Sequence, residues 1–194
     1  MNKSRSLDTH KLVLLALLTA IVIIFQFLGA FIKFGPFSIS LVLMPIAVGA
    51  ALIGVAAGGW LGLVFGFVVL ISGDAAPFMA VDPLGTVLVV LVKGMLAGLA
   101  AGALYKLLEK IGRTAATIAA ATVCPIVNTG IFIIGSYIFF LPTITQWAGD
   151  AGATSYIFLS MVGANFLFEL GLNIVLIPVI VRLIQYSRDK RLRA

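Results

Sequence analysis

The sequence predicts an all-α membrane protein, a bundle of six transmembrane helices with both termini in the cytoplasm. Three observations lead to this prediction: the composition, the length of the apolar segments and the placement of basic residues. The 194 residues are 62% hydrophobic and only 10% charged, with a mean hydropathy of +1.21. A soluble domain carries roughly a quarter charged residues. Because so little polar surface cannot cover a globule in water, the solvent of this chain must be lipid.

Apolar segments alternate with short polar segments along the whole chain, which predicts one integral membrane domain over residues 1–194. Each span needs roughly 20 apolar residues, so six helices fit this length and eight do not. Residues 72–83 and 141–155 are expected to be loops, because they carry aspartate, proline and glycine. A turn at Gly58-Gly59 separates the second and third helices. The predicted helices cover 12–32, 38–56, 59–72, 84–105, 114–140 and 156–185.

Basic residues form three clusters, and six helices would place all three on one side of the membrane. The clusters are Lys3, Arg5 and Lys11; Lys106, Lys110 and Arg113; and Arg182, Arg188, Lys190, Arg191 and Arg193. The positive-inside rule assigns this side to the cytoplasm of a cell membrane. If the second and third helices were one broken helix, the C-terminal tail would lie on the opposite side.

Several function classes are excluded by what the chain lacks. His10 is the only histidine and lies in the N-terminal tail, which rules out histidine-based metal sites and catalytic triads inside the membrane. No phosphate-binding loop of the G-x-x-x-x-G-K-[ST] type is present, and no basic patch on a soluble fold suggests nucleic-acid binding. Cys124 lies in an apolar stretch and is expected to be a free core thiol. We therefore expect a protein that is not an enzyme and holds no metal or cofactor of its own.

Polar side chains at membrane depth are the remaining candidates for function. Lys93 lies about 13 Å and Asn128 about 18 Å from the outer ends of their helices, at 1.5 Å per residue. Asn165, Glu169 and Asn173 are spaced by four and share one helix face. Charged groups in a bilayer core usually face a cavity or a partner. These residues predict a site that opens to the outside.

Structural roles for the same residues are the alternative. Lys93 and Glu169 can neutralise each other, and the asparagines can join helices by hydrogen bonds. For Asn173, which is nearest the cytoplasm, this structural role is favoured. For Asp82, which precedes Pro83, we predict a helix N-cap rather than a ligand contact.

Five segments carry a resemblance to a known family: LALLTAI with Ala16 and Ala20, GPFSISLVLMPIAVGAALIG, LVKGMLAGLAAGALYKLLEK, PIVNT and NFLFELGLNIVLIP. In these segments the chain resembles the S components of energy-coupling factor (ECF) transporters, which are membrane subunits that bind the substrate. The resemblance covers nearly the whole chain and is closest to the riboflavin and pantothenate branches. The Pro-Thr-Gly-Gly-Tyr segment typical of the biotin branch is absent.

This resemblance implies a subunit that binds a water-soluble vitamin from outside. It also implies two kinds of partner: a membrane coupling (T) subunit, and two cytoplasmic ATPases that use ATP. The A-x-x-x-A face of the first helix, Ala16 and Ala20, would dock the coupling subunit. The family's pocket is built from the loop after helix 1 and from helices 4, 5 and 6. The residues that match this pocket are Lys93, Asn128, Asn165 and Glu169, with Phe34 and Phe37 as a lid.

The polar residues leave the substrate open. One lysine suits a carboxylate, which pantothenate has, or an acceptor-rich ring, which riboflavin has. Glu169 can accept hydrogen bonds from the hydroxyl groups of either compound. The alternative function is a stand-alone secondary transporter of a small polar solute, in which Lys93 and Glu169 couple transport to an ion. A purely structural membrane subunit would use the same residues only to join helices.

Overall fold

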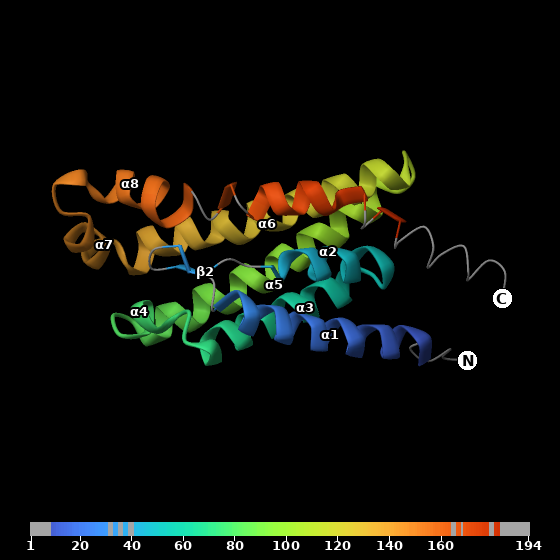
Figure 1. Cartoon of the computed structure of the whole chain (residues 1–194), viewed down its shortest axis with the longest axis horizontal. Coiled ribbons are helices and arrows are strands. Elements are labelled where there is room, and N and C mark those ends of the chain that lie inside the picture. The colour runs from blue at the N-terminus through green and yellow to red at the C-terminus, as the bar shows by residue number, and fades with distance from the viewer. Residues whose placement is uncertain are drawn as a thin grey trace, which may run out of the picture.

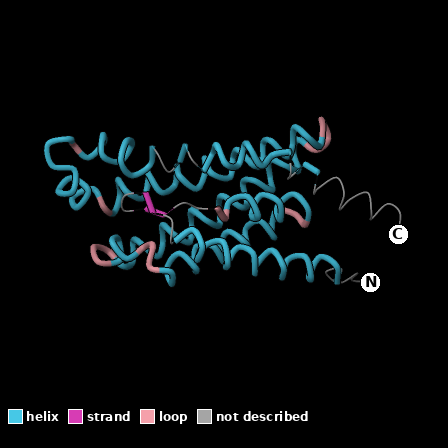
Figure 2. Tube along the Cα trace, viewed as in Figure 1, coloured by secondary structure: helices cyan, strands magenta, loops and turns pink. Residues whose placement is uncertain are grey.

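The computed structural model describes residues 9–30, 33–34, 37–38, 41–163, 166–167, 169–178 and 181–182. Helices make up nearly all of the described chain, and the longest of them run side by side along one axis (Figure 1). The only described strands are β1 (Lys33–Phe34) and β2 (Phe37–Ser38), which pair antiparallel directly after the first helix (Figure 2).

The described helices divide by length into two groups. Four of them are long and apolar enough to cross a membrane: α1 (Thr9–Ala30), α3 (Val55–Ser72), α5 (Pro83–Leu108) and α6 (Arg113–Phe139). Two apolar helices are shorter: α2 (Leu43–Leu52) and the stretch Glu169–Pro178. The chain is therefore a helical membrane protein, and the six-helix bundle with cytoplasmic termini stays a prediction.

The centre of the bundle is the packing of α3 and α6 on either side of α5. α1 packs against α3, and α2 fits between α3, α5 and α6. The buried core between these helices includes Ile46, Leu61, Phe65, Ala97 and Cys124. Cys124 is a free buried thiol, as predicted.

The turn predicted at Gly58-Gly59 is wrong, because both glycines lie inside α3. The chain instead turns at Gly54, whose φ of 135° lies in the region that favours glycine. Gly58 is needed for close packing rather than for a turn, since a Cβ there would collide with the backbone carbonyl of Gly98 on α5. The helix predicted over 38–56 is likewise shorter, from Leu43 to Leu52.

A second pair of glycines brings α3 and α5 equally close. A Cβ built on Gly94 would collide with the carbonyl oxygen of Gly62, and one on Gly62 would collide with that of Gly94. Small residues at such crossings let helix backbones approach and pack in a membrane, where no hydrophobic effect drives helices together.

We expect Gly94→Ala to destabilise the protein by about 1–3 kcal/mol, because the obstructing atoms belong to backbone and cannot rotate away. The measurement is the thermal unfolding temperature of the purified protein in detergent. Gly130→Ala on α6 is the matched control, since a Cβ there meets nothing within 4 Å. An equal unfolding temperature for the two variants would contradict this packing.

The loop between α3 and α5 contains one short helix, α4 (Ala76–Met79), and ends in a cap. Asp82 is the N-cap of α5: its Oδ1 accepts a hydrogen bond of 2.9 Å from the Gly85 N–H, and Pro83 is the first helical residue. The N-cap role predicted for Asp82 is confirmed.

The prediction of a loop over 141–155 is wrong. This segment folds into α7 (Leu141–Ala148), the 3-10 turn η1 (Gly149–Ala151) and α8 (Ala153–Ser155), and the π-helical segment η2 (Tyr156–Gly163) follows. Ile144 and Ala148, one helical turn apart, are buried on one face of α7. Ile144 joins Phe78, Phe140 and Ile157 in a second apolar cluster beside the main core.

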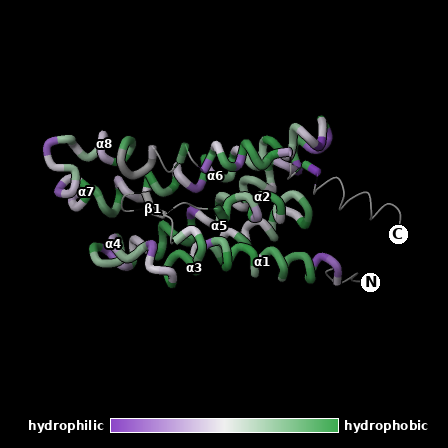
Figure 3. Tube along the Cα trace, viewed as in Figure 1, coloured by the Kyte–Doolittle hydropathy of each residue, from purple (hydrophilic) through white to green (hydrophobic). Residues whose placement is uncertain are grey.

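Basic residues gather at one end of the bundle. The start of α1 and the α5–α6 turn lie together at the right of Figure 1, and hydrophilic colouring marks both in Figure 3. These segments carry Lys11, Lys106, Lys110 and Arg113. The β1–β2 pair, α4 and α7 lie toward the opposite end.

Candidate functional site

Lys93 on α5 lies between two neighbouring helices. Its Nζ is 5.1 Å from the centroid of the Phe132 ring on α6 and 5.8 Å from that of Phe65 on α3. Both distances are within the range in which a cation is attracted to an aromatic face. Two rings from two helices therefore hold the ammonium group in the interior of the bundle rather than at its surface.

Two carboxylates interact with this ammonium group. Glu169, on the last described helix, and Asp74, just after α3, both act electrostatically on Lys93. Glu169 is only 2% exposed. Asp74 follows Gly73, whose φ of 87° ends α3 and turns the chain into the loop that bears the carboxylate. When two opposite charges are buried together, their attraction offsets part of the free-energy cost of removing each charge from water.

Two asparagines lie on the helices that flank the cluster. Asn128 on α6 is 5% exposed, and its Oδ1 has no hydrogen-bond partner among the described residues. Asn173 is 2% exposed and donates from Nδ2 to the backbone oxygen of Glu169, at 2.8 Å. That bond lies within the Asn173 helix, so the described contacts give it a local role rather than one in joining two helices.

Gln26 on α1 is a member of this region that the sequence analysis did not single out. Its side chain is 2% exposed, and Nε2 donates a hydrogen bond to Oδ2 of Asp74. Asp74 belongs to the segment 72–83, which was predicted to be a loop. The available signal was a glutamine in an otherwise apolar span, because such residues are rare at membrane depth unless they face a partner.

Three predicted site residues lie outside what can be described. Asn165 is not among the described residues, and for Phe34 and Phe37 the structure describes only the backbone of the β1–β2 pair. Their assignment to the pocket and its lid stays a prediction.

The predicted docking residues Ala16 and Ala20 lie on the exposed face of α1. Large apolar side chains share this face, among them Leu17 at 59% and Ile24 at 55% exposed. The opposite face of α1 packs inward through Leu18, Val22 and Gln26. α1 therefore has one apolar face against the bundle and one directed away from it.

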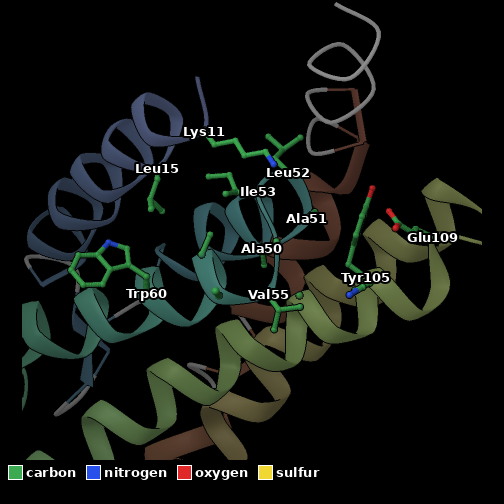
Figure 4. A pocket seen from close by; sticks show the side chains of 15 residues that line it. Lys11, Leu15, Ala50, Ala51, Leu52, Ile53, Val55, Trp60, Tyr105 and Glu109 are labelled. Atoms are coloured by element: carbon green, nitrogen blue, oxygen red, sulfur yellow. The ribbon is translucent and has the colours of Figure 1, made fainter. Parts of the chain in front are cut away.

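A separate groove opens at the basic end of the bundle (Figure 4). It has a volume of about 860 Å³ and is bordered by α1, the α2–α3 turn and the last turns of α5. Lys11 on α1, Trp60 on α3, and Tyr105 and Glu109 on α5 line it. None of the described polar cluster around Lys93 lines this groove, so the two features are distinct.

The cluster around Lys93 joins charged and neutral polar groups. It combines one ammonium group, two carboxylates and the Gln26 amide. No group of three or more histidine, cysteine or acidic side chains able to hold a metal occurs within the described part of the chain. Such a set of convergent polar groups in an apolar site is typical of specific small-molecule recognition.

Comparison with known proteins gives one result. The family model of the ECF transporter substrate-specific component matches residues 10–181. This match includes every residue of the Lys93 cluster. No curated protein matches the chain.

Proposed function

Since the chain belongs to the family of ECF transporter substrate-specific components, we propose that it is the high-affinity binding subunit of an ATP-driven importer for a water-soluble vitamin or related micronutrient. Riboflavin and pantothenate are the favoured substrates. The observation that carries this proposal is the polar cluster of Lys93, Asp74, Glu169 and Gln26, in which Glu169 and Gln26 are buried and Lys93 and Asp74 are half-buried. The buried Asn128 on α6 is assigned to the same site as part of the proposal. The family is one of transporter subunits, not of enzymes.

The proposed substrate site lies at the end of the bundle away from the basic residues. The bundle has six transmembrane helices, with α2 and the Glu169–Pro178 helix as the two shorter members, and both termini are in the cytoplasm of the cell membrane. Lys11, Lys106, Lys110 and Arg113 at one end support this orientation by the positive-inside rule. The site then faces outward, and Asn165, Phe34 and Phe37 complete it.

The family implies partners that supply energy and a route through the membrane. We assign these roles to a membrane coupling subunit, docked on the Ala16 and Ala20 face of α1, and to two cytoplasmic ATPases. Support comes from the apolar outward face of α1, which exposes Leu17, Ile21 and Ile24 beside the two alanines. ATP is used by the partner subunits.

The test is whether the isolated chain binds a vitamin. We expect mass spectrometry of small molecules released from the purified protein to show one vitamin at near one-to-one ratio. We also expect isothermal titration with riboflavin and with pantothenate to give saturable binding of that vitamin. An empty protein that binds neither compound would contradict the favoured substrates.

A further inference from the structure

Gln26 is the one buried polar side chain of α1. α1 contains Leu18, Val22 and Gly29 as its other buried residues, and Gln26 lies between them on the same inward face. Placing a primary amide among apolar groups is costly unless its donors and acceptors are used. The position of Gln26 therefore calls for partners on both atoms of its amide.

Only one of these atoms has a partner in the described structure. Nε2 donates to the Asp74 carboxylate, whereas Oε1 is buried and accepts no hydrogen bond from any described residue. If Gln26 served only to join α1 to the α3–α4 turn, its Nε2 alone would make the contact. The burial of Oε1 without a partner would then have no explanation. A buried acceptor without a partner is unfavourable, so a ligand that donates a hydrogen bond to it binds more tightly.

The same deficit occurs on α6. Asn128 Oδ1 is also buried with no partner among the described residues. The carboxylates of Asp74 and Glu169 add acceptors, and Lys93 is the ammonium group with which both carboxylates interact. An acceptor-rich site with its lysine already flanked by carboxylates recognises donors on a ligand, such as hydroxyl or amide hydrogens.

We propose that Gln26 and Asp74 form an additional arm of the substrate site, in which Gln26 Nε2 fixes the Asp74 carboxylate and Gln26 Oε1 accepts a hydrogen bond from a hydroxyl group of the substrate. The inference rests on the proposed function. It assigns α1 a direct part in recognition through its inward face, and it makes hydroxyl groups the feature by which the substrate is selected.

The test compares Gln26→Met with the wild-type protein against a vitamin and its analogue lacking hydroxyl groups. The pairs are riboflavin with lumiflavin, and pantothenate with a deoxy analogue. Methionine matches the length of glutamine but cannot accept the bond. We expect Gln26→Met to weaken binding of the vitamin about tenfold, as for one lost neutral hydrogen bond. Binding of the analogue should change by less than about twofold.

Thr19→Val is the matched control, because it removes another polar group of α1, whose hydroxyl bonds to Leu15 and Trp60. This control should bind both compounds like the wild type. If Gln26→Met does not fold, Gln26→Leu, a side chain of similar volume that also lacks the acceptor, replaces it.

Three outcomes overturn the inference. Equal weakening of the vitamin and its analogue would make Gln26 a structural residue only, and so would unchanged binding of both. In these two cases the wild-type protein still binds a vitamin, so the proposed function stands. If the wild-type protein binds neither vitamin, the favoured substrates fail and the inference fails with them.

Discussion

Replacing Lys93 with methionine should weaken substrate binding by roughly 30- to 1000-fold, corresponding to about 2–4 kcal/mol for a buried charged partner. The variant loses the only ammonium group of the described cluster and leaves Glu169 and Asp74 without the cation between them. Glu169→Gln should weaken binding in the same direction, because it replaces a strong acceptor with a weaker one. The measurement is the dissociation constant from titration of each purified variant.

Lys106→Met is the control for the lost charge, since Lys106 also lies on α5 but is exposed at the basic end. It should bind substrate like the wild type. All variants are compared by thermal unfolding, so that a folded but non-binding protein is distinguished from a misfolded one. Unchanged affinity in both Lys93→Met and Glu169→Gln would remove this cluster as the substrate site.

The second large effect is expected on α1. A variant carrying both Ala16→Trp and Ala20→Trp should lose uptake almost completely while it binds substrate normally. Both alanines are on the exposed face of the helix, where indoles do not disturb the bundle but prevent a partner helix from approaching closely. Uptake is measured with radiolabelled substrate in cells that contain the coupling module, and binding with the purified protein.

Ala103→Trp on α5 is the control, because it places an indole at another exposed alanine. This variant should retain uptake. Normal uptake in the Ala16→Trp/Ala20→Trp variant would show that the coupling subunit docks elsewhere. A loss of binding in that variant would instead show that the exposed face of α1 influences the substrate site itself.

Local chemistry made some features of this protein predictable. Asp82 followed by Pro83 indicated the start of α5, and the structure has that cap. The apolar stretch that predicted a helix over 114–140 folds as α6 from Arg113 to Phe139. The cap depends on residues that are close together in the sequence. The α6 prediction depends only on the length of one apolar stretch.

Features that depend on partners distant in the sequence were not predictable. Gly58-Gly59 has the composition of a turn, and only its packing on Gly98 of α5 explains why it is helical. Residues 141–155 were expected to be a loop from their polar and small residues, yet Ile144 buried against Phe140 stabilises a helix there. The sequence of one segment does not reveal which residues of a distant segment will pack against it.

The same reasoning explains what was found and missed in the candidate site. Lys93, Asn128 and Glu169 were predicted to be site residues because of their depth in the predicted transmembrane helices. In the structure, Lys93 and Glu169 interact electrostatically. Gln26 was not predicted, because the small residues Ala16 and Ala20 that indicated a docking face lie on the opposite face of α1. Its link to Asp74 joins residues 48 positions apart, and no spacing rule reports such a pair.

The most direct test of the central claim is uptake of the bound vitamin into liposomes containing the purified chain, alone or assembled with a coupling subunit and two ATPases. We expect no uptake by the chain alone, even with an imposed proton or sodium gradient, and ATP-dependent uptake by the full assembly that Lys93→Met abolishes. Gradient-driven uptake by the chain alone would contradict the claim and establish an ion-coupled transporter instead.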